Sequence, residues 1–209
     1  NVHYLADKVD DVELILFEVD DGQNNLPSPE TIHELNGVAA SHGLTFTVHL
    51  PLDLRLGDGG DESHLSLVKA RKVINCTRDL NPFAYVLHLD GKEIKNGATS
   101  KQVQEWRDHS TRALEIVGKY AGGAEKLAVE NLEHYPLDFI LPVINRVPVS
   151  RCAQVGGFEV DTTALSTIER SDVRPLRVGT SESHRGITKS KSSFFWRSSP
   201  CRLFRLWIN

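Results

Sequence analysis

Five short apolar runs, each ending on a residue that can bind a metal ion, constrain the fold of this chain more than any other feature. The runs are rich in Val, Leu, Ile and aromatic residues, which is typical of buried parallel strands. The residues at their ends are Glu18, His49, His88, Glu130 and Asp161. The stretches between these ends are long enough for a loop, a helix and a return strand, as a β-α-β unit requires.

The repeated pattern predicts where the five strand ends lie. If all five strands run parallel in one sheet, their carboxyl ends meet at the same edge, and the five polar side chains converge there. Enzymes with a (β/α)8 TIM barrel carry their chemistry at that edge. We therefore predict an α/β protein with a TIM-barrel fold and a site at the mouth of the barrel.

The barrel is expected to be incomplete. Residues 2–9 read as a helix with no strand before it, so the first strand is expected to be missing. After about Thr163 the β-α rhythm stops, and residues 164–209 are dense in Ser and Arg. We predict a partial barrel over residues 1–163 and an atypical tail over residues 164–209. A shifted reading frame or a truncated gene model is favoured over a simple flexible tail, and such a segment is expected to be partly disordered.

Composition excludes several classes of protein. The net charge of −4 and the pI near 6.1 give no basic field, so nucleic acid is not expected as a partner. No apolar run approaches the roughly 18 to 20 residues that span a bilayer. The three cysteines are widely spaced and form no C-x-x-C pair, which favours a reducing, cytoplasmic location. They are Cys76, Cys152 and Cys201.

The strand ends supply the ligands that borderline divalent ions prefer. His49, His88, Glu130 and Asp161 offer imidazole nitrogen and carboxylate oxygen. A single histidine at a strand end is more often structural, but the four residues together favour a metal site. Glu130 is the natural candidate for a carboxylate that bridges two ions. Glu18 is predicted as a ligand, a base or a substrate contact, and its position does not decide among these.

The loop over residues 52–62 is the candidate substrate loop. It holds Arg55 together with three glycines, and loops at this end of a barrel often hold substrate. Arg55 is the candidate contact for a substrate phosphate, although a lone loop cation is most often only solvated. The loop lacks the lysine and threonine of a P-loop, so it does not indicate a nucleotide site.

Four phrases of the sequence resemble the xylose-isomerase-like barrel superfamily, which includes endonuclease IV. Within it, the phrases are most similar to cobamide-remodelling phosphodiesterases of the CbiR type. The resemblance covers about residues 1–161. The phrases are VELILFE at residues 12–18, LPSPETI at 26–32, TVHLPLDLRL at 47–56 and YVLHLDG at 85–91.

The resemblance implies a metal-dependent hydrolase with a small-molecule substrate. His49, His88, Glu130 and Asp161 would bind zinc or manganese, with Glu18 and Glu130 as the catalytic candidates. The reaction would cleave the phosphodiester in the nucleotide loop of a cobamide, releasing cobinamide phosphate and an α-riboside. The family expects a histidine three residues after the aspartate, and Ala164 stands there instead. The site is therefore expected in outline, with some ligands missing.

Three alternatives stay open. A sugar isomerase or epimerase of the same superfamily would use a similar metal site. An abasic-site endonuclease is disfavoured by the acidic pI. A catalytically incomplete barrel would account for Ala164 and the atypical tail. The sequence does not indicate an oligomeric state.

Overall fold

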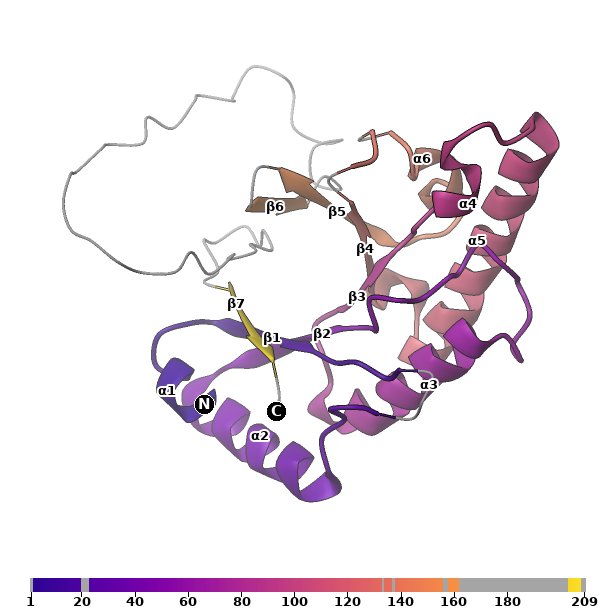
Figure 1. Ribbon diagram of the computed structural model, residues 1–209. Helices are drawn as coiled ribbons and strands as arrows, with labels where there is room; N and C mark the ends of the chain where they lie inside the picture. The colour runs from indigo at the N-terminus through magenta and orange to yellow at the C-terminus, as the bar shows by residue number, and fades with distance from the viewer. Residues whose placement is uncertain are drawn as a thin grey trace, which may run out of the picture.

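A curved sheet of mostly parallel strands forms the centre of the molecule in the computed structural model (Figure 1). The structure describes residues 2–19, 23–132, 134–136, 138–155, 158–161 and 203–207. The strands are β1 (Asp11–Ile15), β2 (Thr45–His49), β3 (Tyr85–His88), β4 (Leu127–Asn131), β5 (Ser150–Val155), β6 (Phe158–Asp161) and β7 (Leu203–Trp207). Their order across the sheet is β6-β5-β4-β3-β2-β1-β7.

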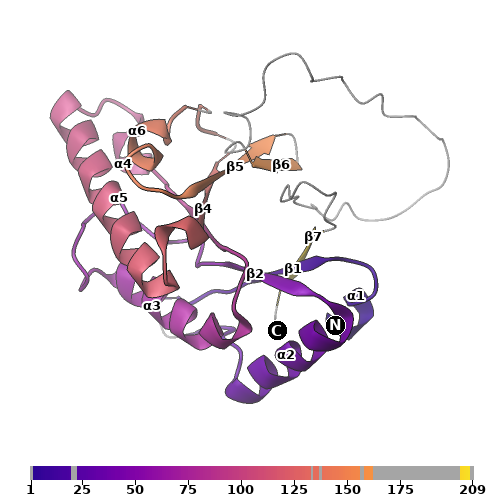
Figure 2. The same cartoon turned by 180° about the vertical axis from the view of Figure 1, so that it is seen from behind.

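Helices connect the consecutive parallel strands. The α-helices are α1 (Val2–Leu5), α2 (Pro29–His42), α3 (Leu65–Thr77), α4 (Lys92–Lys95), α5 (Ser100–Ala121) and α6 (Leu141–Ile144). Two short 3-10 helices, η1 (Arg78–Leu80) and η2 (Ala124–Lys126), follow α3 and α5. The long helices α2, α3 and α5 cover the same side of the sheet in both views (Figures 1 and 2). Sequential strands with helices on one side are the arrangement of a (β/α) barrel, so the predicted fold class is confirmed.

The helix starts follow from local sequence. Helix α2 begins with Ser28 as its cap, whose side chain accepts a hydrogen bond from the backbone of Thr31, and with Pro29 in the first turn. Gly43 ends it in the left-handed conformation at φ 67°. Only Gly43 and Leu44 separate α2 from β2, so the end of the helix also determines where the strand begins.

Alternation along the strands divides the buried side chains into two groups. One large cluster lies between the sheet and its helices and includes Leu14, Val48 and Leu87. A small separate cluster on the other face consists of Ala84, Val86 and Ala128. Because side chains two positions apart share a face, His88 follows Val86 and Glu130 follows Ala128 on this inner face.

The strand that ends at Asp161 runs in the opposite direction to the prediction. β6 pairs antiparallel with β5, whereas the other neighbouring strands pair parallel. The place next to β4 belongs to β5, which the sequence analysis did not identify. Two glycines, Gly156 and Gly157, separate β5 from β6 in the sequence, and a Gly-Gly pair between two strands is a signal for a tight antiparallel hairpin. The expectation that the strand ending at Asp161 runs parallel to the others was therefore wrong.

A strand from late in the chain lies beside β1. β7 pairs parallel with β1, with Leu203 opposite Asp11 and Trp207 opposite Ile15. It falls within the segment predicted as an atypical tail, of which residues 164–202 and 208–209 lie outside the described part of the chain. The division at residue 163 stays a prediction. None of the described helices is long and apolar enough to cross a membrane.

Candidate metal centre

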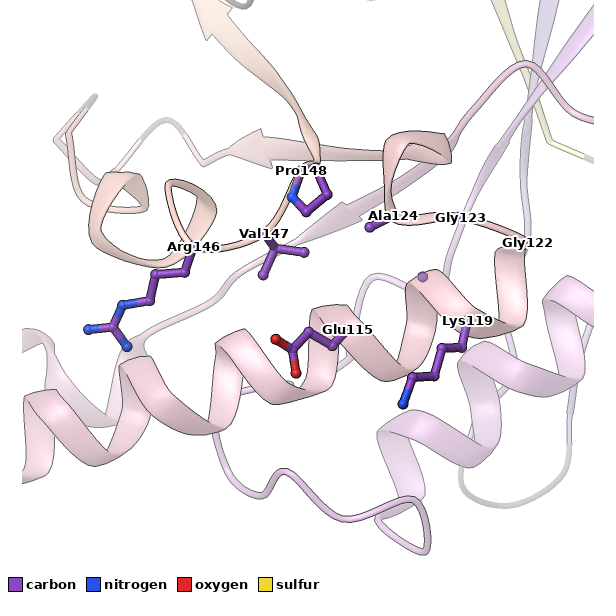
Figure 3. Close-up of a pocket in the computed structure, with 9 residues that line it drawn as sticks. Glu115, Lys119, Gly122, Gly123, Ala124, Arg146, Val147 and Pro148 are labelled. Carbon is purple, nitrogen blue, oxygen red and sulfur yellow. The ribbon is translucent and has the colours of Figure 1, made fainter.

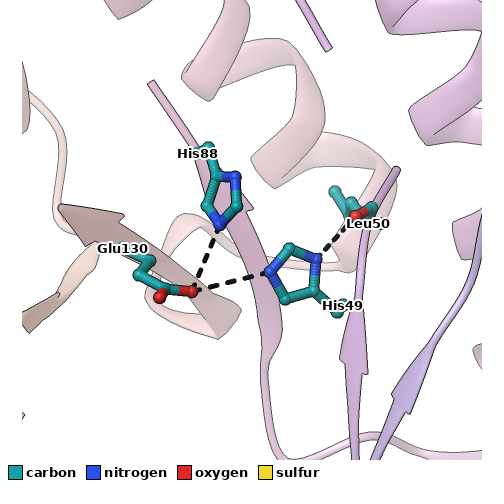
Figure 4. Close-up of polar contacts among 4 residues, drawn as sticks. All are labelled: His49, Leu50, His88 and Glu130. Atoms are coloured by element: carbon teal, nitrogen blue, oxygen red, sulfur yellow. Dashed lines mark hydrogen bonds and ion pairs between the residues drawn. The ribbon is translucent and has the colours of Figure 1, made fainter. Parts of the chain in front are cut away.

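Three of the predicted ligands meet at the carboxyl ends of adjacent strands. His49 ends β2, His88 ends β3, and Glu130 lies near the end of β4. One potential ligand atom from each lies within 4.8 Å of the other two. Figure 4 shows the three side chains pointing toward one another, with Glu130 facing both imidazole rings. The predicted convergence is therefore present for these three residues.

His49 is held in one orientation by the backbone of the next residue. Its Nδ1 atom lies 2.7 Å from the carbonyl oxygen of Leu50. A carbonyl oxygen can only accept, so Nδ1 donates the proton and Nε2 is the ring atom left to face the other ligands. That Nε2 atom is buried, lies 3.6 Å from Oε2 of Glu130 and has no hydrogen-bond partner among the described residues.

This arrangement places three potential ligand atoms close together in a buried site. The side chains of His49 and Glu130 are 2% and 3% exposed. A cation between an imidazole nitrogen and a carboxylate oxygen would be bound by both, and buried charges are stabilised when they are paired in this way. Two imidazole nitrogens and one carboxylate oxygen are also a donor set that zinc, manganese and iron accept. The residues present therefore fit a divalent metal ion.

His88 forms the more open side of the centre. Its Nε2 atom lies 3.2 Å from Oε2 of Glu130, and its ring meets that of His49 edge-on at a centroid distance of 4.8 Å. Its side chain is 15% exposed, compared with 2% for His49. A substrate would therefore approach the centre past His88 more readily than past His49.

Glu18 does not join this centre. It lies three residues beyond the end of β1 and forms an ion pair with Lys72 of α3. It also bridges to Asn24 across the loop after β1. Among the described residues, the group of potential ligand atoms does not include Glu18, whose carboxylate pairs with a helix lysine, and its role as a ligand, a base or a substrate contact stays a prediction.

Arg55 lies in the loop after β2, as expected. Its backbone N–H donates to Oγ of Ser66 at 2.8 Å, which ties the loop to the start of α3. The residue lines a polar hollow of about 180 Å³, together with Asp53, His64 and Lys69. A contact between Arg55 and substrate stays a prediction.

Asp161 is placed by the register of the sheet. It lies opposite Cys152, which in turn lies opposite Glu130 on β4. The backbone of Asp161 is thus level with that of Glu130, two strands away, although its strand runs in the opposite direction. Its role as a metal ligand stays a prediction, and Ala164 lies outside the described residues.

A second hollow lies away from the strand ends. It has a volume of about 540 Å³ and lies between the last turns of α5 and the connection that follows α6 (Figure 3). Glu115, Lys119 and Arg146 supply its charged side chains. None of the predicted site residues lines it, so it is separate from the metal centre.

The sequence analysis missed the groups that support the ligands. The carbonyl of Leu50 orients His49, and Tyr135 reaches from the loop after β4 to Asp90, which follows β3. For Leu50 a signal was present, since Pro51 restricts the residue before it to extended backbone. Asp90 also accepts from the backbone of Lys92 at 3.2 Å, but its contact with Tyr135 could not be read from spacing.

Comparison with known proteins gives only distant likenesses. No protein-family model matches the chain, and no significant match is found among curated proteins. Among solved structures, a D-tagatose 3-epimerase-like protein has a TM-score of 0.48 and 14% identity, over 69% of this chain and 55% of its own. A Thermus thermophilus protein soaked with ZnCl2 has a TM-score of 0.48 and 19% identity, over 68% and 55%. Endonuclease IV from Thermus thermophilus has a TM-score of 0.44 and 16% identity, over 66% and 51%.

The chain spans about half the length of each of these solved structures. Likenesses of this size do not decide a function. We therefore base the proposed function on the geometry of the metal centre and on the residues that form it.

Proposed function

We propose that this protein is a metal-dependent phosphodiesterase in which His49, His88 and Glu130 hold a zinc or manganese ion. The observation that carries the proposal is the convergence of three potential ligand atoms, among them the buried Nε2 atom of His49, which lies 3.6 Å from Oε2 of Glu130 and has no hydrogen-bond partner among the described residues. A divalent ion at this point would be held by the two imidazole nitrogens and the carboxylate oxygen. Three protein ligands leave coordination positions for substrate and water, as in catalytic zinc sites.

The bound ion would neutralise charge on a phosphate oxygen and would lower the pKa of a bound water. The protein residues prepare the site for this. The carbonyl of Leu50 keeps His49 in the tautomer that presents Nε2. Val86 and Ala128 lie two positions before His88 and Glu130 on the inner face, and the buried polar residue Thr47 lies two positions before His49. Burial of the ligands strengthens their electrostatic interactions with a bound phosphate.

Glu130 is proposed as a ligand before any other role. Its Oε2 atom is the one that both imidazoles approach, at 3.2 and 3.6 Å. An oxygen shared in this way is committed to the cation and is poorly placed to accept a proton from substrate. As a catalytic group, Glu18 stays a candidate only, because its carboxylate is engaged by Lys72.

The nucleotide loop of a cobamide is proposed as the substrate. The proposal is supported by the phrases around His49 and His88, which resemble cobamide-remodelling phosphodiesterases, and by the acidic net charge, which disfavours DNA. Arg55, in the loop after β2, is the proposed contact for the phosphate. Asp161 is proposed as a further ligand, and a reducing cytoplasm as the location.

Metal content of the purified chain tests the centre. We expect about one divalent ion per chain, and less than a tenth of that in His88→Ala and in Glu130→Ala. His33→Ala is the matched control, because His33 is an exposed histidine on α2. Equal metal content in all four proteins would mean that any ion binds elsewhere and would sink the proposed centre.

Three substrates then separate the possible reactions of a metal-loaded chain. Release of an α-riboside from a cobamide supports the proposal. Epimerisation of a ketose would favour a sugar isomerase, and nicking of DNA at an abasic site would favour an endonuclease. Either of these outcomes without cobamide cleavage would overturn the substrate assignment while leaving the metal centre intact.

A further inference from the structure

The loops that follow β3 and β4 are joined by one tyrosine. The hydroxyl of Tyr135 donates to Oδ1 of Asp90 at 2.6 Å, and the backbone N–H of Gly91 donates to the same hydroxyl at 3.1 Å. Asp90 lies two residues beyond His88, and Tyr135 lies five residues beyond Glu130. The loops that follow the two ligand-bearing strands are thus connected at a second point, outside the ligands themselves.

Asn131 fixes the loop between Glu130 and Tyr135. It directly follows Glu130, and its Nδ2 atom donates to the carbonyl of Leu132 at 3.4 Å and to that of Tyr135 at 3.3 Å. The residue is buried at the end of β4. The backbone of Tyr135 is therefore tied to the strand that carries Glu130.

The ring of Tyr135 is packed so that its hydroxyl has little freedom. It stacks on Phe139 at a centroid distance of 4.3 Å, and Phe139 in turn packs against Trp106 of α5 at 5.3 Å. A Cβ atom added to Gly91 would lie 2.4 Å from Cζ of Phe139, so this aromatic group rests directly on the backbone after β3. Close packing of these aromatic rings therefore holds the hydroxyl of Tyr135 against Asp90.

His88 depends on this support more than His49 does. His49 has an anchor of its own in the carbonyl of Leu50. Within the described part of the chain, Glu130 is the hydrogen-bond partner that the structure gives to the ring of His88. The position of His88 is therefore set by its backbone and by the loop that follows it.

From these contacts we propose that Tyr135 is a positioning residue, which acts through Asp90 to hold His88 at the correct distance from Glu130 for metal binding. The inference rests on the proposed metal centre. Hydrogen-bonding partners outside the direct ligands commonly affect metal affinity by 10- to 100-fold, because they fix the orientation of the ligands before the ion arrives.

The test compares Zn²⁺ affinity, measured with a competing chelator, among single variants. Tyr135→Phe removes the hydroxyl and keeps the stacked ring, and we expect it to weaken binding by about 10-fold or more. Tyr120→Phe is the matched control and should leave affinity unchanged, because the buried hydroxyl of Tyr120 on α5 has no hydrogen-bond partner within the described ranges. Asp90→Asn retains an oxygen that can accept from Tyr135, and should lose much less affinity than Asp90→Ala.

A second readout needs no metal. In the metal-free chain, the imidazole NMR signals of His88 should broaden or split in Tyr135→Phe, whereas those of His49 should not change. Affinity equal to that of the Tyr120→Phe control, with unchanged His88 signals, would overturn the positioning role and leave the proposed function standing. If the parent binds no Zn²⁺, the proposed function fails, and the His88 signals alone decide whether Tyr135 positions that ring.

Discussion

His88 and Glu130 lie directly opposite each other on β3 and β4, and 3.2 Å separates Nε2 of His88 from Oε2 of Glu130. The register of two parallel strands therefore brings these residues side by side. Opposite residues on neighbouring strands place their side chains on the same face of the sheet. Any change that shifts this register would separate the two ligands and would also displace the other side chains on the inner face of the sheet.

Chelation of metal should destabilise the parent and leave Glu130→Gln almost unchanged. A ligand that binds only the folded state adds about 2.7 kcal/mol when its concentration is 100 times its Kd. Denaturant unfolding with Zn²⁺ and with a chelator measures the difference directly. The same chelator effect in parent and variant would show that Glu130 does not hold the ion.

Gly57→Ala should destabilise the folded chain by about 1–3 kcal/mol, the usual range for overpacking. A Cβ atom there would lie 2.0 Å from Nε1 of Trp106, whose side chain is buried. Gly37→Ala is the opposite case, because nothing lies within 4 Å of the added atom in helix α2. It should stabilise by about 0.5–1 kcal/mol. Denaturant unfolding of both variants checks the pair, and equal effects would contradict the packing of Trp106 on the loop after β2.

Alkaline unfolding should report on Tyr135. Burial raises the pKa of its hydroxyl above the ordinary value of 10.0, and the hydrogen bond to Asp90 raises that pKa further. The folded chain therefore holds this proton more tightly than the unfolded chain does. The stability that this provides is complete below about pH 10 and is lost as the pH rises through the folded pKa.

The measurement is the free energy of unfolding from pH 8 upward. Tyr135→Phe should lose less stability on the alkaline side than the parent loses. Tyr4→Phe serves as the control, because a hydrogen bond with Lys8 and the charge of that lysine lower the pKa of the exposed Tyr4. A parent and a Tyr135→Phe variant with parallel pH curves would argue against the buried Tyr135–Asp90 contact.

Thr99→Ala should destabilise the chain by about 0.5–2 kcal/mol, whereas Thr99→Ser should be close to the parent. Thr99 caps α5, since its Oγ1 accepts from the backbone of Gln102 at 3.3 Å and its own N–H donates to Oε1 of Gln102 at 2.9 Å. Thermal unfolding of the two variants separates the hydroxyl from the rest of the side chain. If Ser and Ala behave alike, the cap contributes little to α5.

The three-residue centre could be predicted because its positions follow from local sequence. The runs that end at His49, His88 and Glu130 are apolar and have the length of strands, and helix signals separate them. Parallel strands with sequential order then bring their carboxyl ends together without further information. The two-residue period also decides which face each ligand occupies, so three separate sequence positions become one site.

The positions of Glu18 and Asp161 depend on more than where the apolar runs end in the sequence. The strand before Glu18 ends at Ile15, and the distant Lys72 captures the carboxylate, which depends on how α3 packs. β6, which ends at Asp161, pairs antiparallel with β5. The Gly156-Gly157 pair in the sequence indicates such a reversal, but the prediction gave more weight to the alternation of strands and helices. The contact between Asp90 and Tyr135 joins two loops and depends on side-chain packing that no spacing encodes.

The pairing of β7 with β1 has a consequence for how the protein is made. β1 leaves the ribosome long before Leu203–Trp207, because the whole stretch between Ile15 and Leu203 is synthesised in between. Contacts so distant in sequence have a high loop-closure entropy and form slowly. Until β7 emerges, the β7-side edge of β1 lacks this partner, and an unpaired edge can pair with another chain. Newly synthesised chains would then be most prone to aggregate in the interval before β7 docks, and a chaperone that shields β1 would act in that interval.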